Sequence, residues 1–349
     1  HMIKIAHLSD THIRNLKYLK QYKIVFDQMY KKLREEDVDI IVHCGDLAHT
    51  KINLSPEYFD VASDFIKNLA DIAPLVIIPG NHDGNLRTST RQDAITPIVK
   101  ALNHSNIHYL KQSGEFVLGS VCFNVLSVFD TDNWVKPSDD SKINIALYHG
   151  AVSGCETDLG WKMDNADHDL VIFKGHDYAM LGDIHKTNQE LDIEGRVRYC
   201  GSTLQQNFAE TDDKGFLIWE IEDKDKFDVR MCSFKNPKPF VTIELTPRGS
   251  LPKNITAPQG ARIRVVANAR LPYDKIRRAT EAVKTRFRPE SVTYLNRYKG
   301  QAFVNENQLV IEKNLRDIAV QESFIKDYLK DYEPSEELLR AVSYTHLTL

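Results

Sequence analysis

The sequence predicts an α/β fold, because strand-like and helix-like segments alternate along it. Short runs rich in Ile and Val, such as IKIAHL (3–8) and VDIIVHC (38–44), have the length and composition of buried strands. Between them, residues 17–35 place apolar side chains at the spacing of one helical face: Tyr18, Tyr22, Val25, Phe26, Met29 and Leu33. These aromatic side chains are expected to belong to a hydrophobic core.

The next elements have recognisable ends. Ser55-Pro56-Glu57 predicts a helix start, because Ser caps free N–H groups, Pro fits the first turn and Glu stabilises the helix dipole. This helix is expected to run to about Ala70, and APLVIIP (73–79) after it resembles another buried strand. A second helical pattern covers 92–103. The segment that follows is expected to be β-rich, with strands near 107–110, 115–119, 121–128, 143–148, 169–174, 197–200 and 215–221.

A polar segment with two prolines, KNPKP (235–239), predicts a domain boundary. The elements expected beyond it are strand 240–246, strand 261–267, helix 272–287 and strand 291–298. The last part is helical and acidic, and it is too short for an independent core. We therefore expect three parts: 2–234, 238–300 and 301–342.

Composition indicates a globular protein of ordinary type, with 349 residues, 42% hydrophobic and 27% charged. No apolar stretch approaches the ~20 residues of a membrane span. The N-terminus lacks a signal-peptide pattern, so we expect a cytoplasmic protein with no membrane partner. The five cysteines include no CxxC pair, which indicates neither a disulfide framework nor a structural zinc site. They are expected to be small buried hydrophobes.

Five short strings contain the side chains with the most informative chemistry. They are LSDTH (8–12), HCGDLAH (43–49), PGNHD (79–83), LYHG (147–150) and LGDIH (181–185). The first four directly follow or overlap strand-like runs, and the carboxyl ends of strands are where ligand groups gather in layered α/β folds. One Asp or His near a strand end is more often a cap, and Gly-Asp is a common turn. Five such strings in order favour a metal site.

The donor types fit divalent ions that accept both oxygen and nitrogen, such as manganese, zinc or iron. Asp10 and His12 lie two residues apart, so they share a face in an extended segment, and Asp183 and His185 repeat this spacing. A two-metal site needs one bridging carboxylate, for which Asp46 in the Gly-Asp turn is the candidate. Asn81 offers a neutral carbonyl oxygen, and His149 offers an imidazole nitrogen.

In this order, the five strings resemble those of the calcineurin-like metallophosphoesterase superfamily. The chain looks most like the DNA-repair branch, the SbcD-type nuclease subunit, and especially its bacteriophage relatives. The resemblance implies a two-sheet β-sandwich flanked by helices, with a small α+β capping domain and C-terminal helices. It also implies two divalent metal ions, Mn²⁺ in the first place and Mg²⁺ as the other candidate. The first ion would take Asp10, His12, Asp46 and His185. The second would take Asp46, Asn81, His149 and the residue two before the last His.

The last string departs from the family pattern, which usually has GHxH. This sequence has Asp183 in place of the first His, and an extra carboxylate should favour manganese or magnesium over zinc. The alternative is that His176, in FKGHDY, supplies the missing imidazole. The spacing favours Asp183.

Cleavage of a phosphodiester needs a nucleophile, neutralisation of the phosphate charge and protonation of the leaving oxygen. His82, next to Asn81 but not needed as a ligand, is the candidate general acid or transition-state donor. Asp83 would orient His82 or cap the following segment. The family has a His three residues after the bridging Asp, which His49 matches, and we expect it to touch the phosphate or the DNA end.

Positive charge points to DNA as the substrate. Residues 261–300 contain eleven Lys and Arg against three Asp and Glu, although the whole chain has a net charge of −4. Arg277 and Arg278 in the predicted helix are expected to contact DNA, but a solvated helix face is the alternative. Loops beside the ligand strings add three candidate phosphate-binding residues: Arg14, Arg87 and Arg91.

The resemblance implies a manganese-dependent exonuclease on duplex DNA and an endonuclease on single strands, acting in break processing and recombination. An SbcC-type coiled-coil ATPase would bind the C-terminal helices, which could instead fold back on the capping domain. A homodimer would form through 55–72 and 90–103, unless the apolar stripe of the first helix packs on its own sheet. A phage-encoded protein would act in the host cytoplasm. Two other functions are a phosphatase or small-nucleotide phosphodiesterase on the same metal core, and a noncatalytic binding subunit, which only Asp183 suggests.

Overall fold

The computed structural model describes residues 1–88 and 90–298. The chain divides into two compact units, His1–Asn236 and a second unit that begins at Pro237. The helices expected at 301–342 lie outside the described residues, as do the last two residues of the expected capping domain. Within the described ranges, no helix is long and apolar enough to cross a membrane.

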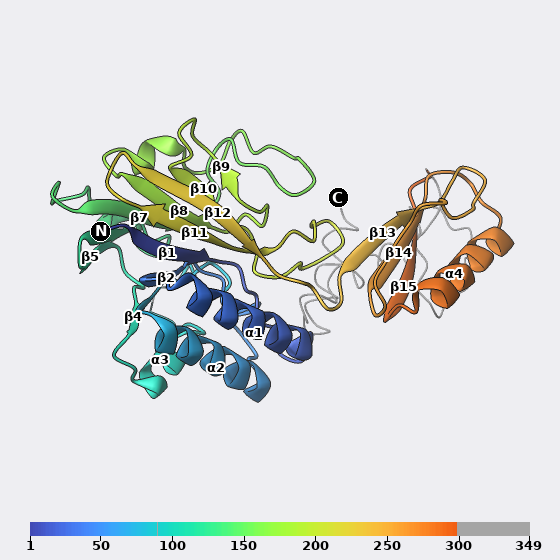
Figure 1. Ribbon diagram of the computed structural model, residues 1–349, viewed down its shortest axis with the longest axis horizontal. Coiled ribbons are helices and arrows are strands. Elements are labelled where there is room, and N and C mark those ends of the chain that lie inside the picture. The colour runs from blue at the N-terminus through green and yellow to red at the C-terminus, as the bar shows by residue number, and fades with distance from the viewer. Residues whose placement is uncertain (89, 299–349) are drawn as a thin grey trace. The chain divides into compact units, whose positions relative to one another are not determined.

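Two six-stranded sheets pack face to face in the first unit (Figure 1). The first sheet has the order β12-β11-β1-β2-β3-β4. Its strands are β1 (Ile3–Leu8), β2 (Ile40–His43), β3 (Leu75–Ile77), β4 (Ile107–Tyr109), β11 (Gly215–Ile221) and β12 (Phe227–Ser233). Strands β1 to β4 run parallel, and β11 and β12 complete the sheet as antiparallel neighbours.

The second sheet has the order β5-β6-β7-β8-β10-β9. Its strands are β5 (Gly114–Leu118), β6 (Val121–Val125), β7 (Ile143–His149), β8 (Tyr178–Gly182), β9 (Gln189–Glu190) and β10 (Val197–Tyr199). The four central strands β6, β7, β8 and β10 are parallel. Ile5, Val42 and Val76 of the first sheet and Phe123 and Ile145 of the second share one buried core, which confirms the expected sandwich.

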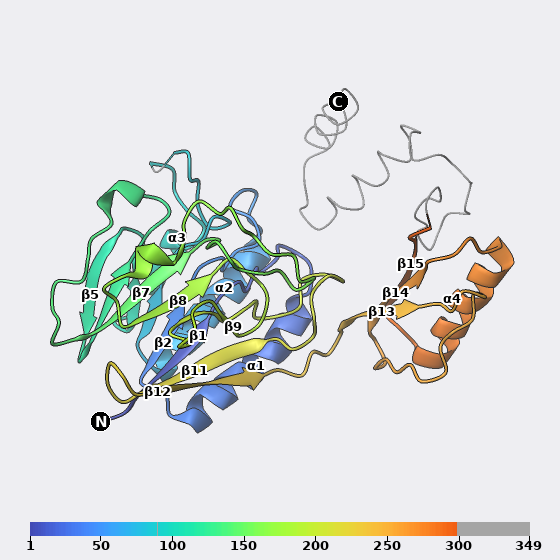
Figure 2. The same ribbon diagram turned by 90° about the horizontal axis from the view of Figure 1, so that it is seen from above.

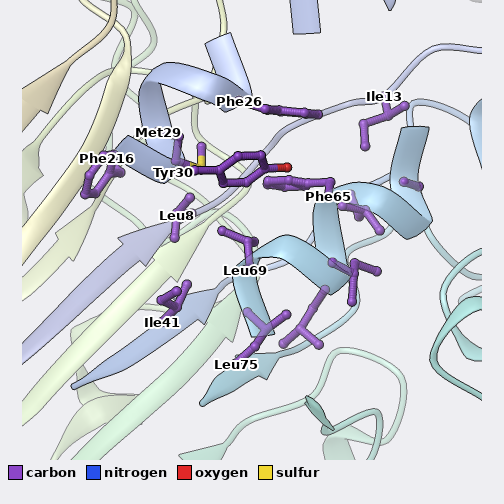
Figure 3. Packing of buried hydrophobic residues seen from close by; sticks show 14 of the residues in the cluster. Leu8, Ile13, Phe26, Met29, Tyr30, Ile41, Phe65, Leu69, Leu75 and Phe216 are labelled. Atoms are coloured by element: carbon purple, nitrogen blue, oxygen red, sulfur yellow. The ribbon is translucent and has the colours of Figure 1, made fainter. Parts of the chain in front are cut away.

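Helices α1 (Leu19–Glu36), α2 (Pro56–Ile72) and α3 (Thr96–Leu102) cover the outer face of the first sheet (Figures 1 and 2). Figure 3 shows Phe26 of α1 over Phe65 of α2, with ring centroids 4.1 Å apart. Burying one such side chain stabilises the fold by about 1.5–3 kcal/mol. The apolar stripe of α2 is buried within this chain, so it packs on its own sheet.

The ends of these helices follow from local chemistry. Ser55 Oγ accepts a hydrogen bond from the Tyr58 N–H at 3.0 Å, as its capping role predicts. Helix α2 ends at Ile72 because Ala73 precedes Pro74 and is extended. The helix expected at 92–103 begins only at Thr96. The Asp93 carboxylate accepts hydrogen bonds from the N–H groups of Ile95 and Thr96 and thereby caps the start of the helix.

One strand prediction was wrong, and three strands were missed. Residues Leu170–Phe173 form a 3₁₀ turn, because the Asp169 carboxylate accepts a hydrogen bond from the Val171 N–H. Leu170 and Val171 are exposed, so this apolar run is not a core strand. Strands β8, β9 and β12 were not predicted. Loops rather than helices cover the outer face of the second sheet, where Val152 and Phe173 join its core.

In its described part, residues 237–298, the second unit contains a three-stranded parallel sheet and one helix (Figure 2). Its elements are β13 (Phe240–Glu244), β14 (Arg262–Ala267), α4 (Tyr273–Phe287) and β15 (Ser291–Asn296). Ile276, Ala279 and Val283 bury one face of α4 in the core of this unit. Arg277 and Arg278 are exposed. All five cysteines of the chain lie in the described residues, where they are free and buried.

Candidate metal centre

Five strand ends bring the seven predicted metal ligands together. Asp10 and His12 follow β1, Asp46 follows β2 and Asn81 follows β3, all in the first sheet. His149 ends β7, and Asp183 and His185 follow β8 in the second sheet. Because these strands are parallel within each sheet, their carboxyl ends meet at one edge of the sandwich.

The first group of ligands contains Asp10, His12 and His185, whose candidate ligand atoms all lie within 4.8 Å of one another. Asp10 Oδ1 is 3.6 Å from His12 Nε2 and 3.6 Å from His185 Nε2. The two imidazole Nε2 atoms are 3.2 Å apart. Three donor atoms thus surround one small volume.

The second group gathers around His149. Its Nε2 lies 3.0 Å from Asn81 Oδ1, 3.2 Å from Asp46 Oδ2 and 3.7 Å from Asp183 Oδ1. The site therefore has an oxygen-rich half, with two carboxylates and one amide oxygen around a single imidazole. Asp183 belongs to this half, whereas the sequence pattern of the family would place a second imidazole there.

Asp46 lies between the two groups. Its Oδ2 is 3.6 Å from His12 Nε2 and 3.2 Å from His149 Nε2, while Oδ1 accepts a hydrogen bond from the His82 N–H at 2.9 Å. Gly80 passes so close that a Cβ on it would lie 2.1 Å from Asp46 Oδ1. The glycine of the third string therefore leaves room for the carboxylate that faces both halves.

Four of the seven ligand candidates have a left-handed backbone. The φ angles are 52° at Asp10, 49° at His12, 57° at Asp46 and 96° at Asp183. Such a conformation costs roughly 1–3 kcal/mol for a residue with a side chain and persists where surrounding contacts fix it. Here the His12 N–H donates to the Asp46 carbonyl at 3.0 Å, and the Asp183 N–H donates to Asp10 Oδ2 at 3.0 Å. This concentration of backbone strain is typical of functional sites.

Hydrogen bonds outside the site fix the tautomers of two imidazoles. His149 Nδ1 donates to the Cys44 carbonyl at 2.7 Å, and His185 Nδ1 donates to Glu210 Oε1. Each ring then presents the lone pair of Nε2 to the site, which is the arrangement that metal-binding histidines need. Burial alone would lower the pKa of His185, but the Glu210 and Asp10 carboxylates raise it well above its usual value, so an ion bound at Nε2 would have to displace a proton.

Glu210 and Lys214, which hold His185 on the side away from the ligand cluster, were not predicted from the sequence. Burial would raise the pKa of Glu210, but His185 and Lys214 lower it to about 2, so the group is a carboxylate. Lys214 Nζ lies 3.6 Å from Glu210 Oε2, and it donates to the His185 carbonyl at 2.6 Å. Both residues lie outside the five strings, in a loop that only the tertiary fold brings to the site.

The donor atoms fit divalent metal ions. Asp10 Oδ1 is buried and accepts no hydrogen bond from any of the described residues, although it faces two imidazoles. Burial lowers the pKa of His12, which favours the neutral imidazole that a metal ion needs. Acceptors that face one another in this way repel unless a cation lies between them. Carboxylate, imidazole and amide donors together suit a first-row divalent ion.

The two catalytic candidates lie beside these ligands. His82 Nδ1 donates to the His49 carbonyl at 2.8 Å, and the rings of His82 and His12 have centroids 5.0 Å apart. His49 Nε2 accepts a hydrogen bond from Arg14 Nη1 at 2.8 Å. Both His49 and His82 are half-buried, so each is reachable from the ligand cluster.

Asp83 connects the second and third strings. Its carboxylate accepts hydrogen bonds from the N–H groups of Leu47, Ala48 and Gly80 at 3.3, 2.8 and 2.8 Å. Burial, together with the neighbouring Asp46 carboxylate, raises the pKa of Asp83 to about 7. These hydrogen bonds of Asp83 hold the two loops in register, rather than orienting the His82 ring or capping the next segment.

The predicted basic residues have different surroundings. Arg14 is buried at 4% exposure and faces His49, whereas Arg87 and Arg91 are exposed in the loop that follows the third string. The structure adds Lys51, whose Nζ donates to the carbonyl oxygen of the ligand candidate Asn81 at 2.9 Å. Sequence reasoning missed this exposed lysine, which follows the second string by only two residues.

His176 is not part of the cluster that the structure forms. Its Nδ1 donates to the Phe173 carbonyl at 3.0 Å, and its Nε2 lies 2.9 Å from Asn124 Nδ2. Both ring nitrogens thus have partners at the opposite end of β8 from Asp183. The geometry favours Asp183 over His176 as the seventh donor.

Three relatives are similar to parts of this chain. Uncharacterized protein R555 of Acanthamoeba polyphaga mimivirus is 38% identical over 256 residues, which cover 69% of this chain and 19% of the relative. Putative phosphoesterase 244L of Invertebrate iridescent virus 6 is 24% identical, over 63% of this chain and 77% of the relative. The DNA double-strand break repair protein Mre11 of Haloferax volcanii is 26% identical, over 70% of this chain and 55% of the relative.

The chain thus spans about a fifth of the mimivirus protein and about half of the archaeal one. A family model described as calcineurin-like phosphoesterase matches residues 3–196, a segment that includes all seven ligand candidates. Together with the two-sheet sandwich and the ligand cluster at its edge, this match shows that the chain belongs to the calcineurin-like phosphoesterase family.

Proposed function

We propose that this protein is a dinuclear-metal DNA nuclease that acts in break processing and recombination, as the nuclease subunit of an SbcC/SbcD-type complex. The observation that supports it most is the position of the Asp46 carboxylate between His12 and His149. Such a carboxylate can bridge two ions, and two-metal sites are suited to displacement at phosphorus. The Mre11 relatives, described as DNA double-strand break repair proteins, support DNA as the substrate.

The residues divide between two ions as the family resemblance implies. Asp10, His12, Asp46 and His185 would hold the first ion, and Asp46, Asn81, His149 and Asp183 the second. When bound, two divalent ions lower the pKa of a water nucleophile and neutralise the phosphate oxygens. Three carboxylates and one amide oxygen make this a site for Mn²⁺, with Mg²⁺ as the second candidate.

His82 is the proposed proton donor. Because its Nδ1 binds the His49 carbonyl, only Nε2 is available to the substrate, and the imidazolium form can protonate the departing sugar oxygen from that atom. Arg14 donates to His49, so we assign Arg14 to the positioning of His49 rather than to direct phosphate contact. His49 then lies beside His82, where it can touch the phosphate or the DNA end.

Basic residues in both units would hold the DNA backbone. Lys51, Arg87 and Arg91 are exposed in the loops of the first unit near the ligand strings. Arg277 and Arg278 are exposed on α4, in the segment where positive residues exceed negative ones by eight. Contacts of this kind bind phosphates and predict little sequence preference.

The proposed partners rest on the resemblance. An SbcC-type ATPase would bind residues 301–342, and a homodimer would form through the segments 55–72 and 90–103. Because the apolar stripe of α2 is buried in its own chain, a dimer would use the remaining residues of these segments. Action in the host cytoplasm is the proposed location, consistent with viral relatives.

The decisive experiment compares two substrates in the presence of Mn²⁺: duplex DNA with one labelled end, and bis(p-nitrophenyl) phosphate. Asp46→Ala and His82→Asn should each abolish DNA cleavage, while Asp27→Ala, at an exposed position of α1, should not. Cleavage of the small ester alone would overturn the nuclease proposal in favour of a small-nucleotide phosphodiesterase. Cleavage of neither substrate would favour a noncatalytic binding subunit.

A further inference from the structure

A hairpin follows the ligand His149 and ends in two apolar side chains. Gly154 N–H donates to the Met163 carbonyl at 2.7 Å, Met163 N–H donates to the Cys155 carbonyl at 2.8 Å, and Thr157 N–H donates to the Trp161 carbonyl at 2.9 Å. Gly160 turns the tip with a φ of 79°, a conformation that favours glycine. The tip of this hairpin is the segment 157–161.

Polar contacts tie the hairpin to the segment that contains His185. Asp158 Oδ2 lies 3.2 Å from Lys214 Nζ, which donates to the His185 carbonyl at 2.6 Å. Glu156 forms an ion pair with Lys186 at 2.6 Å. Lys214 therefore links the tip to the backbone carbonyl of His185, a ligand candidate of the metal centre.

The tip buries charged side chains and exposes apolar ones, which is the opposite of the usual distribution in a folded chain. Asp158 and Lys214 have side chains only 6% and 3% exposed, whereas Leu159 is 77% and Trp161 64% exposed. A turn that buries its charges and exposes its largest apolar side chains lowers the stability of the isolated chain. Exposed apolar groups arranged in this way beside a functional site indicate a contact surface.

The side chains of the tip indicate which kind of ligand it would bind. Trp161 offers a flat aromatic face, and its acidic neighbours Asp158 and Glu156 are already paired with Lys214 and Lys186. Lys162, next to Trp161, is exposed and adds a positive charge at the tip. An aromatic face beside a cation suits a nucleobase together with its phosphate. Asp158 and Lys214 hold the tip to the segment of His185, so a base on Trp161 would belong to the strand at the metal centre.

We propose that Trp161 is a stacking platform for an unpaired base of the strand that is cleaved. This inference rests on the proposed nuclease function and adds the side chain that would hold an unpaired base of a single strand or a frayed end. In an intact duplex each base is already stacked on its neighbours and paired, so its face is not available to the indole. Leu159 would contact the edge of the same base.

The test measures binding of a fluorescent single-stranded oligo(dT) by anisotropy, in a chelator that prevents cleavage. Trp161→Ala and Trp161→Leu should each weaken binding about tenfold, while Trp161→Phe, which keeps a flat ring, should stay within about threefold of wild type. Val171→Ala, at another exposed apolar position, is the matched control and should leave binding unchanged. Melting temperature and Mn²⁺ affinity should be the same in all variants.

Each of the other possible results contradicts either the stacking inference or the nuclease proposal. If wild type binds and cleaves DNA while Trp161→Ala matches it, the stacking inference is wrong and the nuclease proposal is untouched. Equal binding by Trp161→Leu and Trp161→Phe would also overturn stacking, because the leucine has no ring. A loss of Mn²⁺ affinity in Trp161→Ala would mean that the hairpin acts on the metal centre instead. Failure of wild type to cleave any DNA would refute the nuclease proposal itself.

Discussion

Glu210 accepts a hydrogen bond from Nδ1 of His185 and thereby turns the Nε2 lone pair of this ring toward Asp10. The carboxylate is itself held by Ser202 Oγ and the Gln206 N–H, both at 3.0 Å. A buried anion behind a metal-binding histidine fixes the ring and increases its basicity.

We predict that Glu210→Gln lowers metal affinity at the first half of the site by about 10- to 100-fold, because the neutral amide no longer polarises His185. Isothermal titration with Mn²⁺ measures the change. Glu190→Gln, which removes an exposed ion pair with Arg198, is the control and should titrate like wild type.

Asp183 should determine which metal the second half prefers. Asp183→His would exchange an oxygen donor for a nitrogen donor beside His149, and we predict a rise of at least about tenfold in zinc affinity relative to manganese. Competition titrations with both ions give this ratio. His176→Gln should leave both affinities unchanged, because the His176 ring binds Phe173 and Asn124. Loss of one bound ion in His176→Gln would show that the assignment to Asp183 is wrong.

The sequence predicts the ligand residues that directly follow strands of clear Ile and Val composition. Ile and Val runs identify β1, β2 and β3, and the polar strings after them give the ligands. Strand β8 was missed because its run, Tyr178–Gly182, lacks β-branched residues and follows a polar turn. Conversely, the β-branched residues near 171 predicted a strand where Asp169 caps a turn.

Glu210 and Lys214 could not be predicted for a different reason. They lie in a loop without periodicity, and their role depends on the hydrogen bond and ion pairs that they form with residues distant in sequence. Asp46 is a different case, because its Gly-Asp turn and the family resemblance already made it the candidate bridging carboxylate, and its Oδ2 lies between His12 and His149. Order along the chain identifies donors, whereas their division into two groups follows from the tertiary fold.

Lys51 is expected to contribute a phosphate contact at the outer edge of the site. We predict that Lys51→Met lowers kcat/KM for DNA about tenfold at low salt and reduces the slope of log affinity against log salt by about one. Binding titrations from low to moderate ionic strength measure this slope. Lys31→Met, which removes a charge that is 77% exposed on α1, is the matched control. An equal change of slope in both variants would mean that Lys51 acts only through net charge.

His7 should make the stability of the protein depend on pH. Trp219 Nε1–H donates to His7 Nδ1 at 3.2 Å, so Nε2 carries the proton and donates to the Leu181 carbonyl at 3.0 Å. A second proton on Nδ1 would face the indole N–H. Burial, with a smaller effect of His43, accordingly lowers the pKa of His7 from 6.5 to about 3.

The sign of the pH effect follows from proton binding in the two states. Between pH 6.5 and about 3 the unfolded chain binds a proton at His7 that the folded chain excludes, so the contribution is complete above pH 6.5 and is lost as pH falls. The free energy of unfolding should therefore fall by up to about 1.4 kcal/mol per pH unit from this residue. Denaturant titrations between about pH 4 and pH 6, with a chelator in every sample, measure the slope.

Neither His7→Gln nor His7→Asn can bind this proton, so both variants should lose about the same part of the slope even if their absolute stabilities differ. Using two variants separates titration from packing, because the two amides place their polar atoms differently against Trp219 and Leu181. A slope equal to that of wild type in both variants would show that His7 is not the group responsible. The buried neutral imidazole next to the first ligand string would then be only a packing element.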